Sequence, residues 1–238
     1  MSSDSKKSFL LSAWIPFLLV LMMWFVHYIN ISKNLGLHRY GIHPGGKNGL
    51  KGILFSPFIH STRDFSHIIN NSAPIFILSW SLIYFYRKIA WLVFIVSWLA
   101  GGFLVWLIAR DNYHIGMSGI IYSLAFFLFF SGVFRKDTRL MAISMFVVFL
   151  YGSMVWGIFP LDPSVSHESH LMGGVVGLIL AFLLKNHGAT FKRKKYQWEI
   201  DEELEKEMEK KGYTQIVDEE SGFVIRYEYK PKEEEKEE

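Results

Sequence analysis

The chain has 238 residues, of which 51% are hydrophobic and 20% charged, with a net charge of +3 and no cysteine. A small positive charge distributed between apolar blocks does not indicate a nucleic-acid-binding protein, and a sequence without cysteine excludes disulfides, thiol catalysis and cysteine-ligated metals. The mean hydropathy is +0.22 although the tail is strongly charged, so the apolar residues must be concentrated elsewhere.

Six apolar segments approach the length of about twenty residues that a helix needs to cross a bilayer. They are residues 8–29, 65–86, 89–108, 116–134, 140–159 and 167–184. The first is too long for the core of a signal peptide, and we expect it to be retained. The sequence therefore predicts an all-α polytopic membrane protein, with a bundle of six transmembrane helices within residues 1–190.

From residue 191 the composition becomes charged, beginning with the basic cluster at 192–195. Residues 199–211 are rich in Glu, Lys and Leu and predict a helix. Two β-prone runs, 213–217 and 223–229, flank a segment that contains Gly222 and predict a hairpin. We expect residues 191–238 to form a small charged tail without catalytic residues.

Basic residues follow the second, fourth and sixth apolar segments and precede the first. With an even number of spans, these positions all fall on one side of the membrane, together with both termini. The positive-inside rule assigns that side to the cytoplasm. We expect a multi-pass protein embedded in a lipid bilayer, the plasma (inner) membrane if the source is a prokaryote, with both termini cytoplasmic.

Three polar positions lie at one depth within different predicted spans. At about 1.5 Å rise per residue, Ser118 stands about 25 Å from the basic end of its helix. By the same rise, His170 stands about 22 Å and Asn71 about 24 Å from theirs. Polar side chains inside a membrane are costly and usually functional, so this common level predicts a site near the outer surface.

The spacing of residues also predicts which helices meet. Ser118 and Tyr122 share one face of the fourth span, and His170, Gly173 and Gly177 share one face of the sixth. Small residues allow two helix backbones to approach closely, although they also serve ordinary packing. A close crossing would bring His170 to Ser118 as the general base of an activated nucleophile. Because no acidic residue lies deep in any span, we expect a Ser–His dyad.

His67 and Asn71 lie one turn apart on one helix face. With the Ser118 backbone N–H, they are candidate donors to the oxyanion that forms during acyl transfer. Tyr122 is a candidate support for the imidazole or an ordinary core aromatic. Four histidines could approach one another (His67, His114, His167 and His170). Without acidic or thiol ligands at paired spacing, we expect no metal and no other cofactor. The remaining histidines are interpreted as interfacial or loop residues: His27, His38, His43 and His187, together with His114 and His167.

Across residues 8–185 the chain resembles the rhomboid family of intramembrane serine proteases. The motifs that carry the resemblance are Gly116-Met117-Ser118-Gly119 with Tyr122, His170 with Gly173 and Gly177, His67 with Asn71, and Ser56-Pro57-Phe58-Ile59-His60. The resemblance implies a Ser118 nucleophile, a His170 base, and an oxyanion site of His67, Asn71 and the Ser118 N–H. It also implies a six-helix bundle with a water-filled cavity that opens outward, and His60 as a structural neighbour of the site.

These observations predict an intramembrane serine endopeptidase that cleaves single-span transmembrane proteins near the outer membrane boundary. The alternative is a non-catalytic rhomboid-like protein that binds client membrane helices, which would have no need of the Ser118 and His170 pair. A channel or transporter for small solutes is disfavoured, because the sequence shows no inverted-repeat pattern and no charged residue at mid-bilayer.

Overall fold

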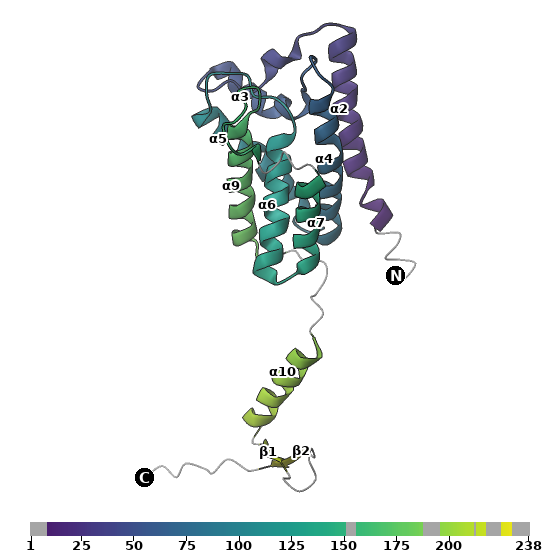
Figure 1. Cartoon of the computed structure of the whole chain (residues 1–238), viewed down its shortest axis with the longest axis vertical. Helices are drawn as coiled ribbons and strands as arrows, with labels where there is room; N and C mark the ends of the chain where they lie inside the picture. Colours follow the sequence, from purple (N-terminus) through teal and green to yellow (C-terminus); the bar gives the residue numbers. More distant parts are fainter. Residues whose placement is uncertain (1–8, 151–155, 188–195, 212, 218–224, 230–238) are drawn as a thin grey trace. The chain divides into compact units, whose positions relative to one another are not determined.

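The apolar segments fold into a helical bundle built around α6, Ser118–Arg135, which lies between α7 and α9 (Figure 1). The structure is a computed structural model that describes residues 9–150, 156–187, 196–211, 213–217 and 225–229. The chain divides into two compact units, Met1–Lys192 and Arg193–Glu238.

The described part of the first unit is helical. Its elements are α2 (Trp14–Ser32), η1 (Leu37–Tyr40), α3 (Lys47–Phe55), η2 (Ser56–Phe58), α4 (Ser66–Phe85), α5 (Ala90–Ile108), α6 (Ser118–Arg135), α7 (Thr138–Leu150) and α9 (His167–Leu183). Among the described helices, α2 and α6 are followed by a residue with positive φ, Asn34 and Lys136. At the end of α6, for example, Lys136 takes φ +55° and the Asp137 N–H bonds the Gly132 carbonyl.

Four helical stretches are long and apolar enough to cross a membrane: Phe9–Ser32, Ser66–Phe85, Ala90–Ile108 and Ser118–Arg135. They match four of the six predicted segments. The two others correspond to α7 and α9, which are apolar but shorter. Residues 151–155 of the predicted fifth segment lie outside the described residues, and the count of six spans stays a prediction.

The outer faces of the long helices are apolar, as lipid contact requires. Phe25 on α2 is 63% exposed, and Ile108 on α5 is 59% exposed. Soluble monomers rarely expose large continuous apolar patches. Lipid tails are as apolar as leucine, so van der Waals packing and polar contacts, rather than burial from water, hold such helices together.

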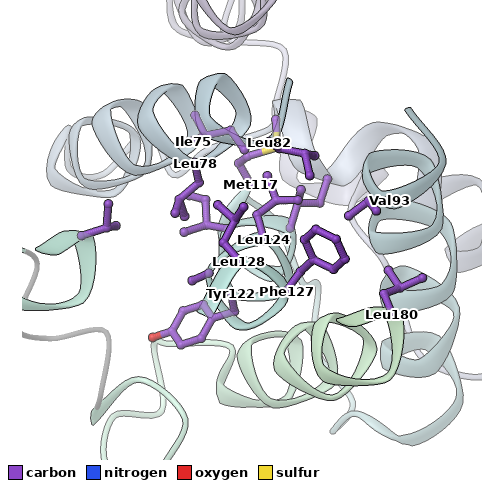
Figure 2. Close-up of a cluster of buried hydrophobic side chains, with 14 of the residues drawn as sticks. Ile75, Leu78, Leu82, Val93, Met117, Tyr122, Leu124, Phe127, Leu128 and Leu180 are labelled. Carbon is purple, nitrogen blue, oxygen red and sulfur yellow. The ribbon is translucent and has the colours of Figure 1, made fainter. Parts of the chain in front are cut away.

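The core forms where α4, α5, α7 and α9 all contact α6. Figure 2 shows side chains of α4, α5 and α9 converging on α6. The labelled core residues are Ile75, Leu78 and Leu82 of α4, Val93 of α5, Leu180 of α9, and Tyr122, Leu124, Phe127 and Leu128 of α6, with Met117 just before it. Because α6 is covered on so many sides, its first residues are held in a fixed place.

The closest helix pair is α6 with α9, and glycines make the approach possible. A Cβ on Gly173 would collide with the backbone carbonyl of Gly119, and one on Gly177 would collide with that of Ser123. At the far end of the pair, the Arg135 guanidinium donates to the Leu184 carbonyl at 2.5 Å and to the His187 carbonyl at 2.6 Å. The two helices are therefore fixed to each other over their full length.

The start of α6 corrects one predicted boundary. The fourth segment was expected to begin at Gly116, but the helix begins at Ser118. Gly116 has a φ of +105°, which is incompatible with a right-handed helix and strongly favours glycine. Its N–H donates to the Ser56 carbonyl at 2.9 Å, so Gly116 forms a sharp bend that delivers Ser118 to the first helical position.

The second unit contains α10, Gln197–Lys210, followed by strands β1, Tyr213–Val217, and β2, Ile225–Tyr229. The strands are antiparallel, with Tyr213 opposite Tyr229. At the start of α10 the Glu199 carboxylate accepts the Tyr196 N–H at 3.0 Å. The predicted basic cluster at 192–195 and the predicted turn at 219–222 lie outside the described residues.

Candidate active site

The bundle brings Ser118 and His170 into direct contact. Ser118 is the first residue of α6, and His170 lies in the first turn of α9 and is 8% exposed. The Ser118 Oγ and the His170 Nε2 are 2.8 Å apart. This is the geometry in which an imidazole nitrogen can accept the proton of a serine hydroxyl.

A backbone carbonyl holds the other nitrogen of the imidazole. His170 Nδ1 lies 2.7 Å from the Gly157 oxygen. A carbonyl can only accept, so Nδ1 carries the hydrogen and Nε2 is left free to accept from Ser118. Fixing this tautomer is the orienting role that a carboxylate plays in a catalytic triad. The sequence offered no signal for it, because any residue can supply a carbonyl.

Tyr122 packs flat against the same imidazole. The two ring centroids are 4.2 Å apart and the planes differ by 11°. Tyr122 is four residues after Ser118 on α6, and this spacing puts its ring under His170. A Cβ on Gly157 would collide with the Tyr122 hydroxyl and lie 2.9 Å from His170 Nδ1. The imidazole is therefore confined by the Tyr122 ring and by the backbone at Gly157.

His67 and Asn71 lie beside the backbone that leads into Ser118. A Cβ on Gly116 would lie 2.6 Å from His67 Nε2 and 3.4 Å from Asn71 Nδ2. The absence of a side chain at Gly116 lets both polar groups approach this point. The structure thus brings two polar side chains from the start of α4 to the turn that carries the nucleophile candidate.

His60 supports Asn71 from behind. The Asn71 Nδ2 donates to His60 Nε2 at 3.0 Å, and His60 Nδ1 donates to the Phe58 carbonyl at 3.4 Å. The rings of His60 and His67 are 5.0 Å apart. Burial, reinforced by the nearby His67, lowers the pKa of His60 to about 3. A neutral His60 keeps Nε2 as an acceptor and so fixes which way the Asn71 amide points.

This buried histidine predicts a loss of stability in acid. In the unfolded chain His60 is protonated below its ordinary pKa of 6.5, whereas in the folded protein it stays neutral until about pH 3. The free energy of unfolding should therefore fall by about 1.4 kcal/mol per pH unit below pH 6.5 through this group alone. The measurement is the unfolding midpoint in detergent between pH 7 and pH 4.

The same series should separate His60 from other titrating groups. A His60→Asn variant should show a shallower dependence than the wild type, because the mismatched proton uptake is removed. His38→Asn, which replaces an exposed histidine, is the matched control and should keep the wild-type dependence. Parallel curves for wild type and His60→Asn would show that His60 does not contribute.

Two histidines that were interpreted as interfacial or loop residues are buried. His27 was interpreted as interfacial or in a loop, but it lies within α2, is 2% exposed, and packs against Phe65 at a ring distance of 5.3 Å. His114 is in a loop as expected, yet it is 3% exposed and bonds Ser166 Oγ at 2.6 Å. Helical periodicity in a sequence predicts which face of a helix is buried, but not how helices and loops pack against one another. The burial of His27 and His114 could therefore not be predicted from it.

A small cavity of about 30 Å³ lies behind the nucleophile candidate, lined in part by Ser97, His114, Gly116, Gly119 and Ser169. This is about the volume of one water molecule in the liquid.

Within the described ranges, no group of three or more His, Asp or Glu side chains is arranged to hold a metal ion.

The stretch of chain that carries these residues is similar to known proteins. The Rhomboid domain matches residues 47–187, more than half of the chain. The uncharacterized protein Rv1337 of Mycobacterium tuberculosis is 30% identical over 175 residues, which cover 69% of this chain and 72% of the relative. The uncharacterized protein Mb1372 of Mycobacterium bovis has the same identity and coverage. The uncharacterized protein ML1171 of Mycobacterium leprae is 29% identical over 174 residues, or 68% of this chain and 67% of the relative.

Four helices of membrane-spanning length with apolar outer faces make the chain an integral membrane protein. The domain match covers the helices that carry Ser118, His170, His67 and Asn71. On this evidence the chain belongs to the rhomboid family, whose members are generally intramembrane serine proteases.

Proposed function

We propose that this protein is an intramembrane serine endopeptidase in which Ser118 is the nucleophile and His170 the general base. The observation that carries the proposal is the 2.8 Å contact between Ser118 Oγ and His170 Nε2. The Gly157 carbonyl supports it by holding Nδ1. A scaffold that only binds client helices needs neither contact.

In the proposed reaction Ser118 Oγ attacks the scissile carbonyl while His170 Nε2 takes the hydroxyl proton. The oxyanion that forms is stabilised by the Ser118 N–H with His67 and Asn71. The imidazolium then protonates the departing amine as the peptide C–N bond breaks. A water molecule, deprotonated by His170, attacks the acyl-enzyme, and the returned proton regenerates the Ser118 hydroxyl.

The substrate is proposed to be a single-span membrane protein cut near the outer boundary of the bilayer. Ser118 begins α6 and His170 lies in the first turn of α9, so the site lies at one end of the bundle. A helical substrate must unwind to expose a peptide carbonyl, which small and helix-breaking residues favour. Lateral entry of the substrate between α4 and α7, the second and fifth predicted spans, is part of the same proposal.

The remaining predictions form part of the same proposal. We propose that α7 and α9 also cross the bilayer, which gives six spans and places both termini in the cytoplasm. Residues 1–190 would then form the membrane-embedded domain and residues 191–238 a cytoplasmic tail. In a prokaryote the membrane would be the plasma membrane.

Covalent labelling tests the nucleophile directly. A fluorophosphonate probe should modify the wild-type protein in detergent, and peptide mass analysis should locate the adduct on Ser118. His170→Ala should label at a small fraction of the wild-type rate, because the hydroxyl loses its base. A folded wild type that fails to label with probes of several sizes would favour the client-binding alternative.

Removing one proposed oxyanion donor should slow the reaction without blocking probe entry. We expect Asn71→Ala to lower kcat about 10²-fold, as loss of a single oxyanion donor does elsewhere. Asn70→Ala is the matched control, because Asn70 is exposed on another face of α4 and should keep wild-type kcat. An Asn71→Ala enzyme with undiminished kcat would remove Asn71 from the oxyanion site.

A further inference from the structure

Side chains of the connection between α5 and α6, other than Ser118, form hydrogen bonds and an ion pair with the start of α9. Arg110 Nη2 donates to the Pro163 carbonyl at 2.9 Å and to the Val165 carbonyl at 2.6 Å. Its Nε lies 3.5 Å from the Glu168 carboxylate. One arginine thus fixes the loop just before α9 and the first turn of that helix.

His114 adds a second and more specific link. Its Nε2 donates to the Arg110 carbonyl at 3.1 Å, which leaves Nδ1 as an acceptor. The Ser166 hydroxyl therefore donates to Nδ1 at 2.6 Å, and the Ser169 hydroxyl donates to Ser166 Oγ at 2.7 Å. These bonds form one directed chain from Ser169 through Ser166 to His114.

The surroundings of His114 favour the neutral imidazole that this chain requires. Burial lowers the pKa of His114, although the hydrogen bond to the Arg110 carbonyl acts in the opposite direction. The His114 backbone is also anchored, because its N–H and carbonyl both pair with Ile42 at 2.9 Å. The neutral His114 ring, on a backbone fixed by Ile42, can therefore hold the start of α9 in position.

The chain of hydrogen bonds ends next to His170. Ser166 is the N-cap residue of α9, yet its hydroxyl makes no helix cap and bonds His114 instead. The Ser166 carbonyl accepts the N–H of His170 at 3.3 Å. Ser169, the residue before His170, packs its carbonyl against Gly119, where a Cβ would come within 3.3 Å. The network therefore starts four residues before Ser118 and ends one residue before His170.

We propose that His114 is a positioning residue that, through Ser166 and Ser169, sets the His170 imidazole against Ser118 Oγ. This inference rests on the proposed serine protease function. It assigns a role to Ser169 and Ser166, whose hydroxyls would otherwise have no part in the site. Because a displacement of about 1 Å can cost up to about 10²-fold in rate, a modest relaxation of α9 should be measurable.

The test is the saturation kinetics of fluorophosphonate labelling with the full-length protein in detergent, which separates the maximal labelling rate from the probe affinity. His114→Phe keeps a ring of similar shape but removes both nitrogens, and it should lower the maximal rate about tenfold with probe affinity within about twofold. Ser166→Ala should lower the maximal rate by the same factor. The double variant with His114→Phe and Ser166→Ala should be no slower than either single variant, because each substitution breaks the same chain of hydrogen bonds.

A conservative replacement distinguishes positioning from simple packing. His114→Gln retains one acceptor and one donor and should restore most of the wild-type rate. Ser164→Ala is the control from the same loop, since the Ser164 hydroxyl bonds Asp162 and not His114. Wild-type rates in both His114→Phe and Ser166→Ala would overturn the inference, and so would a His114→Gln variant as slow as His114→Phe. A wild type that does not label at Ser118 would instead overturn the proposed function.

Discussion

We expect Ser118→Ala to abolish proteolysis, with the turnover of a transmembrane reporter in liposomes lowered by about 10⁴-fold or more. The substitution removes the only atom of residue 118 that can attack a carbonyl. The fold should survive, because the Gly157 carbonyl and the Tyr122 ring still hold the imidazole. The measurement is the rate of reporter cleavage, together with the unfolding midpoint of the same preparation.

The control for this substitution lies in the same helix. The Ser123 hydroxyl donates to Ser97 Oγ at 2.7 Å and does not contact His170, so Ser123→Ala should keep most of the activity. His170→Ala should lose nearly as much as Ser118→Ala, and the double variant no more, because the two residues act as a unit. Reporter cleavage by Ser118→Ala at a rate near the wild type would refute the assignment of the nucleophile.

The positions of the long helices could be predicted from the sequence because membrane spans obey a simple rule. Lipid offers no hydrogen bonds, so a spanning segment must be a long apolar helix, and this is visible in one dimension. Residues 65–86 and 89–108 correspond closely to α4 and α5. The boundary at Gly116 was wrong by two residues, because the φ of +105° there is set by contact with Ser56 and His67.

The candidate site was predictable where helical periodicity and depth carry the information. Ser118 and His170 lie in the first turns of two helices whose crossing is marked by glycines, and Ser118 Oγ lies 2.8 Å from His170 Nε2. Contacts made by backbone atoms or loops have no such mark. The Gly157 carbonyl and the His114 network depend on how the connections between helices pack, and no spacing in the sequence encodes that.

The glycine contact between α6 and α9 predicts that the smallest side chain at Gly173 should disable the protein. A Cβ there would overlap the Gly119 carbonyl oxygen and lie 3.0 Å from its carbon. Backbone atoms of a packed helix cannot turn aside, so α9 must move away from α6 and carry His170 with it. We expect Gly173→Ala to lower the free energy of unfolding by about 2–3 kcal/mol and the labelling rate of Ser118 by about 10²-fold or more.

Gly101 provides the matched control, because it is a buried helical glycine of α5 with no atom within 4 Å of an added Cβ. Gly101→Ala should leave labelling unchanged and raise stability slightly, since alanine favours a helix by about 1 kcal/mol over glycine. Gly174→Ala should be intermediate, because the atoms nearest to its Cβ would belong to the Phe126 ring, at 3.3 Å, and a side chain can shift. If Gly173→Ala matched Gly101→Ala in both measurements, the two helices could separate without cost, and the contact between Ser118 and His170 would not depend on their close crossing.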